Sequence, residues 1–195
     1  GEQGTFTEAE EKILSPVERE IWRQRHNAIR RQREAECAQR HEEAARQAQN
    51  ALNASFPCSS EHAYLRRKGI PALGNVRQDR NGMLLIPVRD SSGKVQSLQY
   101  IAPDGTKRFF RGRKSPGRAF RHSREDGKAF VLCEGYATGA SIHLACECTV
   151  YVTFSANNLS VVANIVRRKF PDAPSSCAAT MMKQAVAKGR RPRKR

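Results

Sequence analysis

The sequence predicts an α/β protein in which a parallel βαβα segment follows a small antiparallel β-rich region and a long N-terminal helix. Two changes of pattern along the 195 residues predict this order. A polar stretch rich in Arg, Gln, Glu and Ala gives way near residue 58 to short alternating apolar runs. Continuous apolar runs replace these from residue 129. Alternation is typical of antiparallel strands, and continuous runs are typical of buried parallel strands.

Residues 15–54 predict one long helix. "SPVE" supplies Ser15 as N-cap, Pro16 at the first helical position and Glu18 for a capping box. Apolar residues are sparse beyond it, so the helix is expected to be an exposed arm or an interdomain spacer. Its arginines could contact phosphates, but a solvated face with Glu/Arg pairs explains them equally well.

The β-rich region begins with a short helix within residues 59–70 that is predicted to stop at Gly69, and it continues with strands. Three apolar runs between residues 82 and 112 are separated by "DSSG" and "PDGT". These turn sequences predict a three-stranded antiparallel meander. Residues 111–128 predict a polar, basic loop.

The last folded part is predicted to alternate strands and helices. "AFVLC" and "TVYVTFSA" predict two buried strands, and each precedes helical sequence, the second helix starting at an Asn cap. This order predicts parallel βαβ units with right-handed crossovers. No apolar run follows Pro171, so no third strand is expected, and residues 174–195 predict a basic disordered tail.

Composition limits the function classes. Lys plus Arg total 35 against 19 acidic residues, a net charge of +16 that predicts attraction to nucleic acid, although a solvated basic surface explains it too. The sequence has no apolar run of membrane-spanning length and no signal peptide, so we expect a cytoplasmic protein without a membrane partner. A zinc site could be suspected at His143, Cys146 and Cys148, which lie close together in the sequence. The ligands that would complete a tetrahedral site are missing, so no structural zinc is expected. A first residue of Gly rather than Met is compatible with a piece of a longer protein.

The stretch "FVLCEGYATG" places Glu134 directly after an apolar strand. In a parallel sheet, ligands bind beyond the carboxyl ends of the strands. Gly135 is expected to allow a tight reversal and a close ligand approach. One carboxylate holds Mg²⁺ poorly, so Glu134 needs partners from a neighbouring strand. Without them it would be a solvent-facing acid on a loop.

"FVLCEGYATGASIHLA", followed by "TVYVTFSANNLSVVANIVRRKFPDA", resembles the start of a Toprim domain of the kind found in DNA primases of conjugative plasmids and phages. "HAYLRRKGI", "MLLIPVRDSSGKVQSLQYIAPDGTKRFF" and "RGRKSPG" resemble the region before that domain. The resemblance covers about residues 60–173. Together with the polar helical arm at 1–57, it divides the chain into a primase lead-in region at 58–128, a truncated Toprim domain at 129–173 and the basic tail at 174–195.

The resemblance implies the synthesis of RNA primers from NTPs on single-stranded DNA, with a replicative helicase as a further candidate partner. It implies that Glu134 is catalytic at a Mg²⁺ or Mn²⁺ centre, whose main ligands come from an Asp-x-Asp-type motif after a third strand. It places three further residues at active-site turns: Gly135, Gly139 and Asn158. It directs five basic residues toward the template or the triphosphate: Lys107, Arg108, Arg111, Arg113 and Lys114.

The sequence departs from this family because no two of its aspartates are close together, so the metal motif is absent. The zinc-binding segment usual at the amino end is absent too. We therefore expect an inactive primase fragment. The alternative is a non-catalytic nucleic-acid-binding or regulatory protein derived from a primase. A different Toprim activity, such as strand cleavage, is a third candidate.

A change of frame would explain the missing motif. "MMK" at 181–183 must be encoded by ATG-ATG-AA followed by one more base. Read in another frame, this DNA contains GAT-GAA, which encodes Asp-Glu. Extended over "PSSCAATMMKQAVAK", that frame permits Ile-Val-Leu-Cys-Gly-Asp-Asp-Asp-Glu, an apolar strand followed by acids. We therefore hypothesise that one base is lost near codons 172–174, or that ribosomes slip there.

Overall fold

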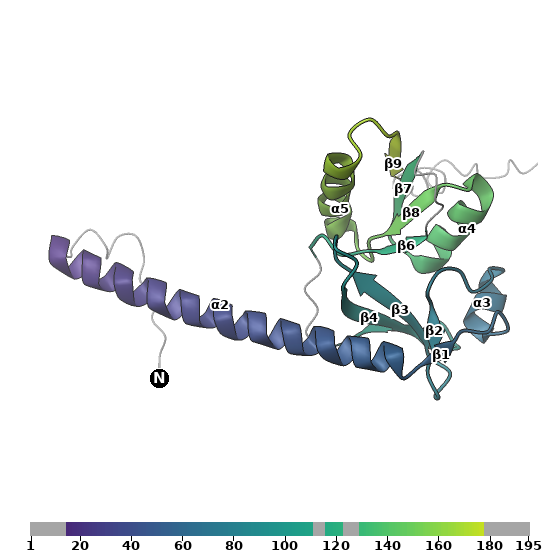
Figure 1. Cartoon of the computed structure of the whole chain (residues 1–195), viewed down its shortest axis with the longest axis horizontal. Coiled ribbons are helices and arrows are strands. Elements are labelled where there is room, and N and C mark those ends of the chain that lie inside the picture. The colour runs from purple at the N-terminus through teal and green to yellow at the C-terminus, as the bar shows by residue number, and fades with distance from the viewer. Residues whose placement is uncertain (1–14, 111–115, 123–128, 178–195) are drawn as a thin grey trace, which may run out of the picture. The chain divides into compact units, whose positions relative to one another are not determined.

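The computed structural model describes residues 15–110, 116–122 and 129–177 (Figure 1). It shows a mixed α/β protein with a long N-terminal helix and an antiparallel sheet, as the sequence predicts. The chain divides into two compact units, Gly1–Arg40 and His41–Arg195. Across the described ranges, none of the helices combines the length and hydropathy that crossing a bilayer needs.

Helix α2 (Pro16–Asn53) begins with the predicted capping box. The Ser15 amide donates to the Glu18 carboxylate at 2.9 Å, and the Glu18 amide donates to Ser15 Oγ at 3.3 Å. The part of the helix in the first unit is polar, and Ile21 and Ile29 are exposed. The last turns belong to the second unit and bury a stripe of small and apolar residues: Ala44, Ala45, Ala48 and Leu52.

The first sheet is antiparallel throughout, in the order β1-β2-β3-β4-β5. Its strands are β1 (Phe56–Pro57), β2 (Arg77–Gln78), β3 (Leu84–Arg89), β4 (Val95–Ile101) and β5 (Lys107–Phe109). The predicted meander is confirmed as β3 to β5, and its turns contain Gly93 and Gly105 at positive φ. Helix α3 (Ala63–Lys68) ends at left-handed Gly69, also as predicted.

Strand β3 is buried on both faces because different elements cover them. On one face, Leu85 packs in a cluster with Leu98 and with Ala48 and Leu52 of α2. Its neighbours Leu84 and Ile86 belong to another cluster, which contains Tyr64 and Leu65. Side chains alternate across a strand, so the apolar run of β3 serves two cores at once.

The second sheet has the order β6-β8-β7-β9 (Figure 1). Its strands are β6 (Phe120–His122), β7 (Phe130–Cys133), β8 (Thr149–Val152) and β9 (Ser175–Cys177). Strand β7 pairs parallel with β8 and β9, and β6 pairs antiparallel with β8. Helix α4 (Tyr136–Cys146) connects β7 to β8, and α5 (Ala156–Lys169) follows β8.

Two expectations were wrong in this sheet. A third parallel strand, β9, does follow Pro171, because ladder hydrogen bonds use backbone groups and the polar Ser175 and Ser176 can supply them at the edge of β7. The predicted basic loop contains strand β6, in which buried Phe120 and His122 flank exposed Arg121. Residues 111–115, 123–128 and 178–195 lie outside the described residues.

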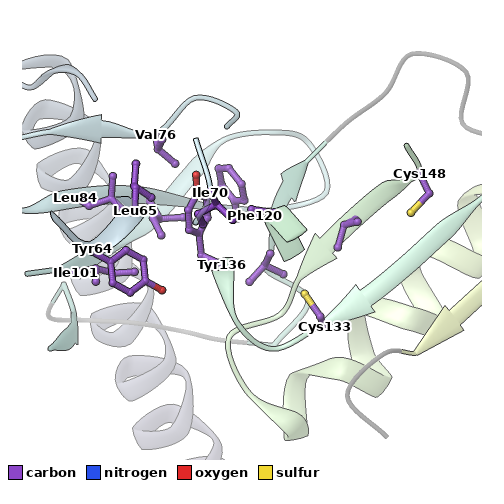
Figure 2. Close-up of a cluster of buried hydrophobic side chains, with 14 residues drawn as sticks. Tyr64, Leu65, Ile70, Val76, Leu84, Ile101, Phe120, Cys133, Tyr136 and Cys148 are labelled. Atoms are coloured by element: carbon purple, nitrogen blue, oxygen red, sulfur yellow. The ribbon is translucent and has the colours of Figure 1, made fainter. Parts of the chain in front are cut away.

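Both sheets share one buried cluster (Figure 2). Phe120 of β6 and Tyr136 of α4 lie with their ring centroids 5.5 Å apart and belong to the same cluster as Leu65. The Tyr136 hydroxyl donates to the Leu73 carbonyl at 3.0 Å and accepts from the Leu73 amide at 3.2 Å. The β-rich and the α/β segments therefore form one compact unit.

His122 is a titratable group whose pKa this core strongly lowers. It is 1% exposed, and neither ring nitrogen has a hydrogen-bond partner of normal geometry among the described residues. Burial lowers the pKa of His122 from 6.5 to about 4, and nearby His143 acts in the same direction, while the backbone of Tyr136 only partly opposes them. The ring is therefore neutral in the folded protein at neutral pH.

We expect stability to fall as the pH decreases from 6.5 toward 4, because the unfolded chain then protonates His122 and the folded chain does not. The shift corresponds to at most about 3 kcal/mol. Thermal melting of the wild type should show a lower Tm at pH 5 than at pH 7.5, and His122→Phe should reduce that difference. Exposed His26→Gln serves as the control; an unchanged difference in His122→Phe would contradict the assignment.

Candidate functional site

Glu134 lies where the sequence predicts it, after the carboxyl end of β7, and it is exposed. Its carbonyl accepts a hydrogen bond from the Phe154 amide at 3.1 Å. Beside it, the Cys133 carbonyl accepts from the Thr153 amide at 2.8 Å and from Thr153 Oγ1 at 3.2 Å. These bonds fasten the turn after β7 to the turn after β8, so both turns lie at one edge of the sheet.

Phe154 connects this edge to the first sheet. Its φ is 64°, a left-handed conformation that a bulky residue adopts only where its surroundings hold it. Its ring meets Phe109 of β5 edge-on, with the centroids 5.8 Å apart. Sequence analysis missed Phe154, because nothing in "TFSA" distinguishes a strained turn from the end of a strand. The contact brings the basic strand β5 to the Glu134 edge.

The basic residues of β5 do not form a single cationic surface. Lys107 and Arg108 are both exposed, but neighbouring residues of a strand point to opposite faces. Lys107 Nζ lies 6.0 Å from the ring centroid of Tyr64, and Arg108 Cζ lies 5.9 Å from that of Tyr100. Partial burial lowers the pKa of Lys107, and the charge of Lys68 adds to this. The other predicted cations, Arg111, Arg113 and Lys114, lie outside the described residues.

Asn158 connects three segments through its buried amide. Its Oδ1 accepts from the Gly117 amide at 2.8 Å, and its Nδ2 donates to the Arg118 carbonyl at 2.7 Å and to the Thr153 carbonyl at 2.8 Å. The predicted Asn cap was wrong: α5 starts at Ala156 after Ser155, and Asn158 lies within the helix. It fixes the chain before β6 against the end of β8, next to the Glu134 edge.

The two glycines have other roles than those predicted. Gly135 has φ −110°, which any residue adopts, and an added Cβ would meet only Thr138 at 3.6 Å. Gly135 does lie in the short turn between β7 and α4, but the turn does not require glycine there. Gly139 lies inside α4 and not in a turn. A Cβ there would come 2.7 Å from Val152 Cγ2 and 3.1 Å from Cys133 Sγ, so Gly139 allows α4 to pack closely on the sheet.

The described residues do not by themselves fit a Mg²⁺ or Mn²⁺ centre. Among them, no three His, Cys, Asp or Glu side chains come together as a metal site would require. Glu134 contributes one carboxylate, whereas such ions usually bind carboxylates together with water and phosphate oxygens. No chemical step at a metal can therefore be derived from this part of the chain.

Comparisons with known proteins identify relatives. No family model matches the chain. Two curated proteins named DNA primase TraC, both from Escherichia coli, are similar to it. One is 38% identical over 123 residues, which cover 60% of this chain and 8% of the relative. The other is 32% identical over 166 residues, which cover 83% of this chain and 16% of the relative. The chain thus spans less than a fifth of the length of these relatives.

One solved structure also matches. It shows the lagging-strand DNA polymerase of bacteriophage T7 with primase domains bound to an RNA/DNA hybrid and dTTP. The match covers 70% of this chain and 72% of the other, with 14% sequence identity and a TM-score of 0.36. A score this low carries no argument about fold, so the relationship to plasmid-type DNA primases rests on the sequence identities.

Asn158→Ala is expected to destabilise the folded chain by about 2–4 kcal/mol, because it leaves the Gly117 amide and two carbonyls without their partner. Urea unfolding measures the change. The neighbouring exposed Asn157→Ala is the matched control and should change stability by less than about 0.5 kcal/mol. Equal effects of the two substitutions would contradict the role of the Asn158 amide.

Gly139→Ala is expected to destabilise the chain although alanine favours helices. The added methyl group collides with Val152, which costs about 1–3 kcal/mol, against a gain of about 1 kcal/mol in helix propensity. Ser141→Ala, at an exposed position of the same helix, should leave the Tm unchanged or slightly higher. A Gly139→Ala variant that melts above the wild type would show that α4 has room to move.

Proposed function

We propose that this chain, a relative of the plasmid-type DNA primases, is a nucleic-acid-binding part of a primase-derived replication protein. In this proposal residues 129–177 are the first half of a Toprim domain. The position of Glu134 supports it best: an exposed acid at the carboxyl end of a parallel strand, beside the turn of the neighbouring strand. That is where ligands of parallel α/β sheets bind.

Strand β9 indicates where the missing ligands would belong. Cys177 pairs with Leu132, two residues before Glu134, and β9 runs parallel to β7. In a complete domain, residues following a strand at this position would leave the sheet at the Glu134 edge. The alternative frame permits Ile-Val-Leu-Cys in place of this polar strand, followed by Gly and then by acidic residues. An apolar strand suits that position better than the exposed Ser175 and Ser176.

We propose accordingly that Mg²⁺ or Mn²⁺ belongs to the complete domain and that the chain with this sequence lacks primer synthesis. Single-stranded DNA and NTPs are its proposed ligands, a replicative helicase is a proposed partner of the complete protein, and the cytoplasm is its proposed location. The net charge of +16 supports binding to nucleic acid. A non-catalytic binding or regulatory role is the second candidate, supported by the single carboxylate at the site.

The test compares this chain with a chain in which the frame is restored near codon 174. On single-stranded template with NTPs and Mg²⁺, the restored chain should make primers and this chain should not. Glu134→Gln should lower the rate of the restored chain by about 100-fold or more. Glu147→Gln, at the other end of α4, is the matched control and should leave the rate unchanged.

Primer synthesis by this chain, abolished by Glu134→Gln, would overturn the proposed inactivity. An inactive restored chain, or DNA around codons 172–183 that lacks the acidic codons in the other frame, would contradict the proposed Toprim site. Salt-sensitive binding of single-stranded DNA by both chains is expected in either case, because phosphate contacts dominate such binding.

A further inference from the structure

A groove of about 280 Å³ opens in the second unit at a place where the two sheets meet. Arg89 at the end of β3 and Ala119 before β6 exchange both backbone hydrogen bonds at 2.9 Å, and both line the groove. Residues of α5 line it as well, and Tyr151 of β8 is among the lining residues. Glu134 is not among the lining residues, so the groove is separate from the edge described above.

The groove is positively charged. Arg89, Arg121 and Lys169 line it, against the single acid Asp90. The Asp90 carboxylate already accepts from Ser92 Oγ at 2.6 Å and from Gln96 Nε2 at 2.6 Å, as well as from two backbone amides. Although burial raises the pKa of Asp90, these hydrogen bonds outweigh it and lower the pKa. The Asp90 carboxylate thus stabilises the β3–β4 turn. The three cations are the lining groups that would attract an anionic ligand.

Apart from Ser91 and Ser92 of the β3–β4 turn, the remaining described lining is apolar and aromatic. Val162, Ile165 and Val166 of α5 lie along one side, and the Tyr151 ring is supported by Phe130, with the centroids 6.1 Å apart. The segment before β6 comes close to α5 because Gly117, at φ 74°, has no side chain. A Cβ there would lie 2.8 Å from Ile165 Cδ1. The Asn158 amide fixes Gly117 in this place.

We propose that this groove binds one nucleotide, with its phosphate between Arg121 and Lys169 and its base against Tyr151. Charged rims and aromatic floors are the combination that single nucleic-acid strands bind. The volume is at the low end for ligand pockets and suits one nucleotide. The ligand is a free nucleotide or one unit of a single strand. The choice of a nucleotide among small anions rests on the proposed function.

The test measures anisotropy of a fluorescein-labelled ten-nucleotide single strand and of a fluorescent ATP analogue in EDTA. Arg121→Gln combined with Lys169→Gln should weaken binding of at least one probe about tenfold and reduce the salt dependence by about two phosphate contacts. The matched control combines Arg168→Gln with Lys68→Gln, which removes the same charge outside the groove and should cost less than threefold. Both variants should melt within a few degrees of the wild type.

Tyr151→Leu should lower affinity about fivefold without changing the salt dependence, because stacking and not charge is lost. A loss confined to the labelled strand identifies the ligand as a unit of a strand, and a loss with both probes shows that a free nucleotide also binds. Equal losses of affinity in the two double variants would contradict nucleotide binding in the groove but would leave the proposed function intact. A wild type that binds neither probe would contradict both.

Discussion

Parallel pairing of β7 with β8 is the constraint on which the candidate sites depend. The register sets Cys133 opposite Val152, so the two strands end together, and the turn after β8 donates hydrogen bonds to the Cys133 and Glu134 carbonyls. Glu134 and Phe154 are therefore held at the same edge by backbone bonds rather than by their own side chains. Because α5 starts from that edge, the same register also positions Asn158 and, through it, the chain that enters β6.

Several strained or buried groups lie close to the paired strands β7 and β8. Phe154 has a left-handed backbone, Gly139 has no space for a methyl group, and His122 is buried without charge. Such features persist only where surrounding contacts outweigh them. Here the cluster shared by both sheets supplies those contacts, which explains why the β-rich segment and the α/β segment form a single compact unit.

Elements with a strong local signal could be predicted from the sequence. The Ser15 capping box, the glycine turns of the meander and the apolar runs of β7 and β8 each depend on neighbouring residues, so helix α2, strands β3 to β5 and the place of Glu134 were predicted correctly. Strands β1, β2 and β9 are two or three residues long and have no periodic pattern. Their pairing depends on partners distant in sequence, which local propensity does not report.

The functional roles of single residues were harder to predict for the same reason. An asparagine near a helix start suggests a cap, and only the fold shows that Asn158 reaches Gly117 and Arg118, about 40 residues away. Arg121 resembled one cation of a basic loop, although it lies in a strand between two buried neighbours, an alternation that "AFRH" already contained. The described residues that line the groove come from four separate stretches of the sequence, so no single sequence motif could indicate it.

The proposed nucleotide groove and the proposed acidic site are physically separable in this chain. The groove is lined by described residues, several of which are positioned by the β7–β8 register and by the Asn158 amide. The acidic site is incomplete among them, because Glu134 has only one carboxylate and further acids would have to arrive beyond β9. Loss of those acids would leave the shared core, the joined turns and the cationic groove unchanged. If the two proposals hold, a chain of this sequence would keep an affinity for nucleotides without the acids that joining them requires.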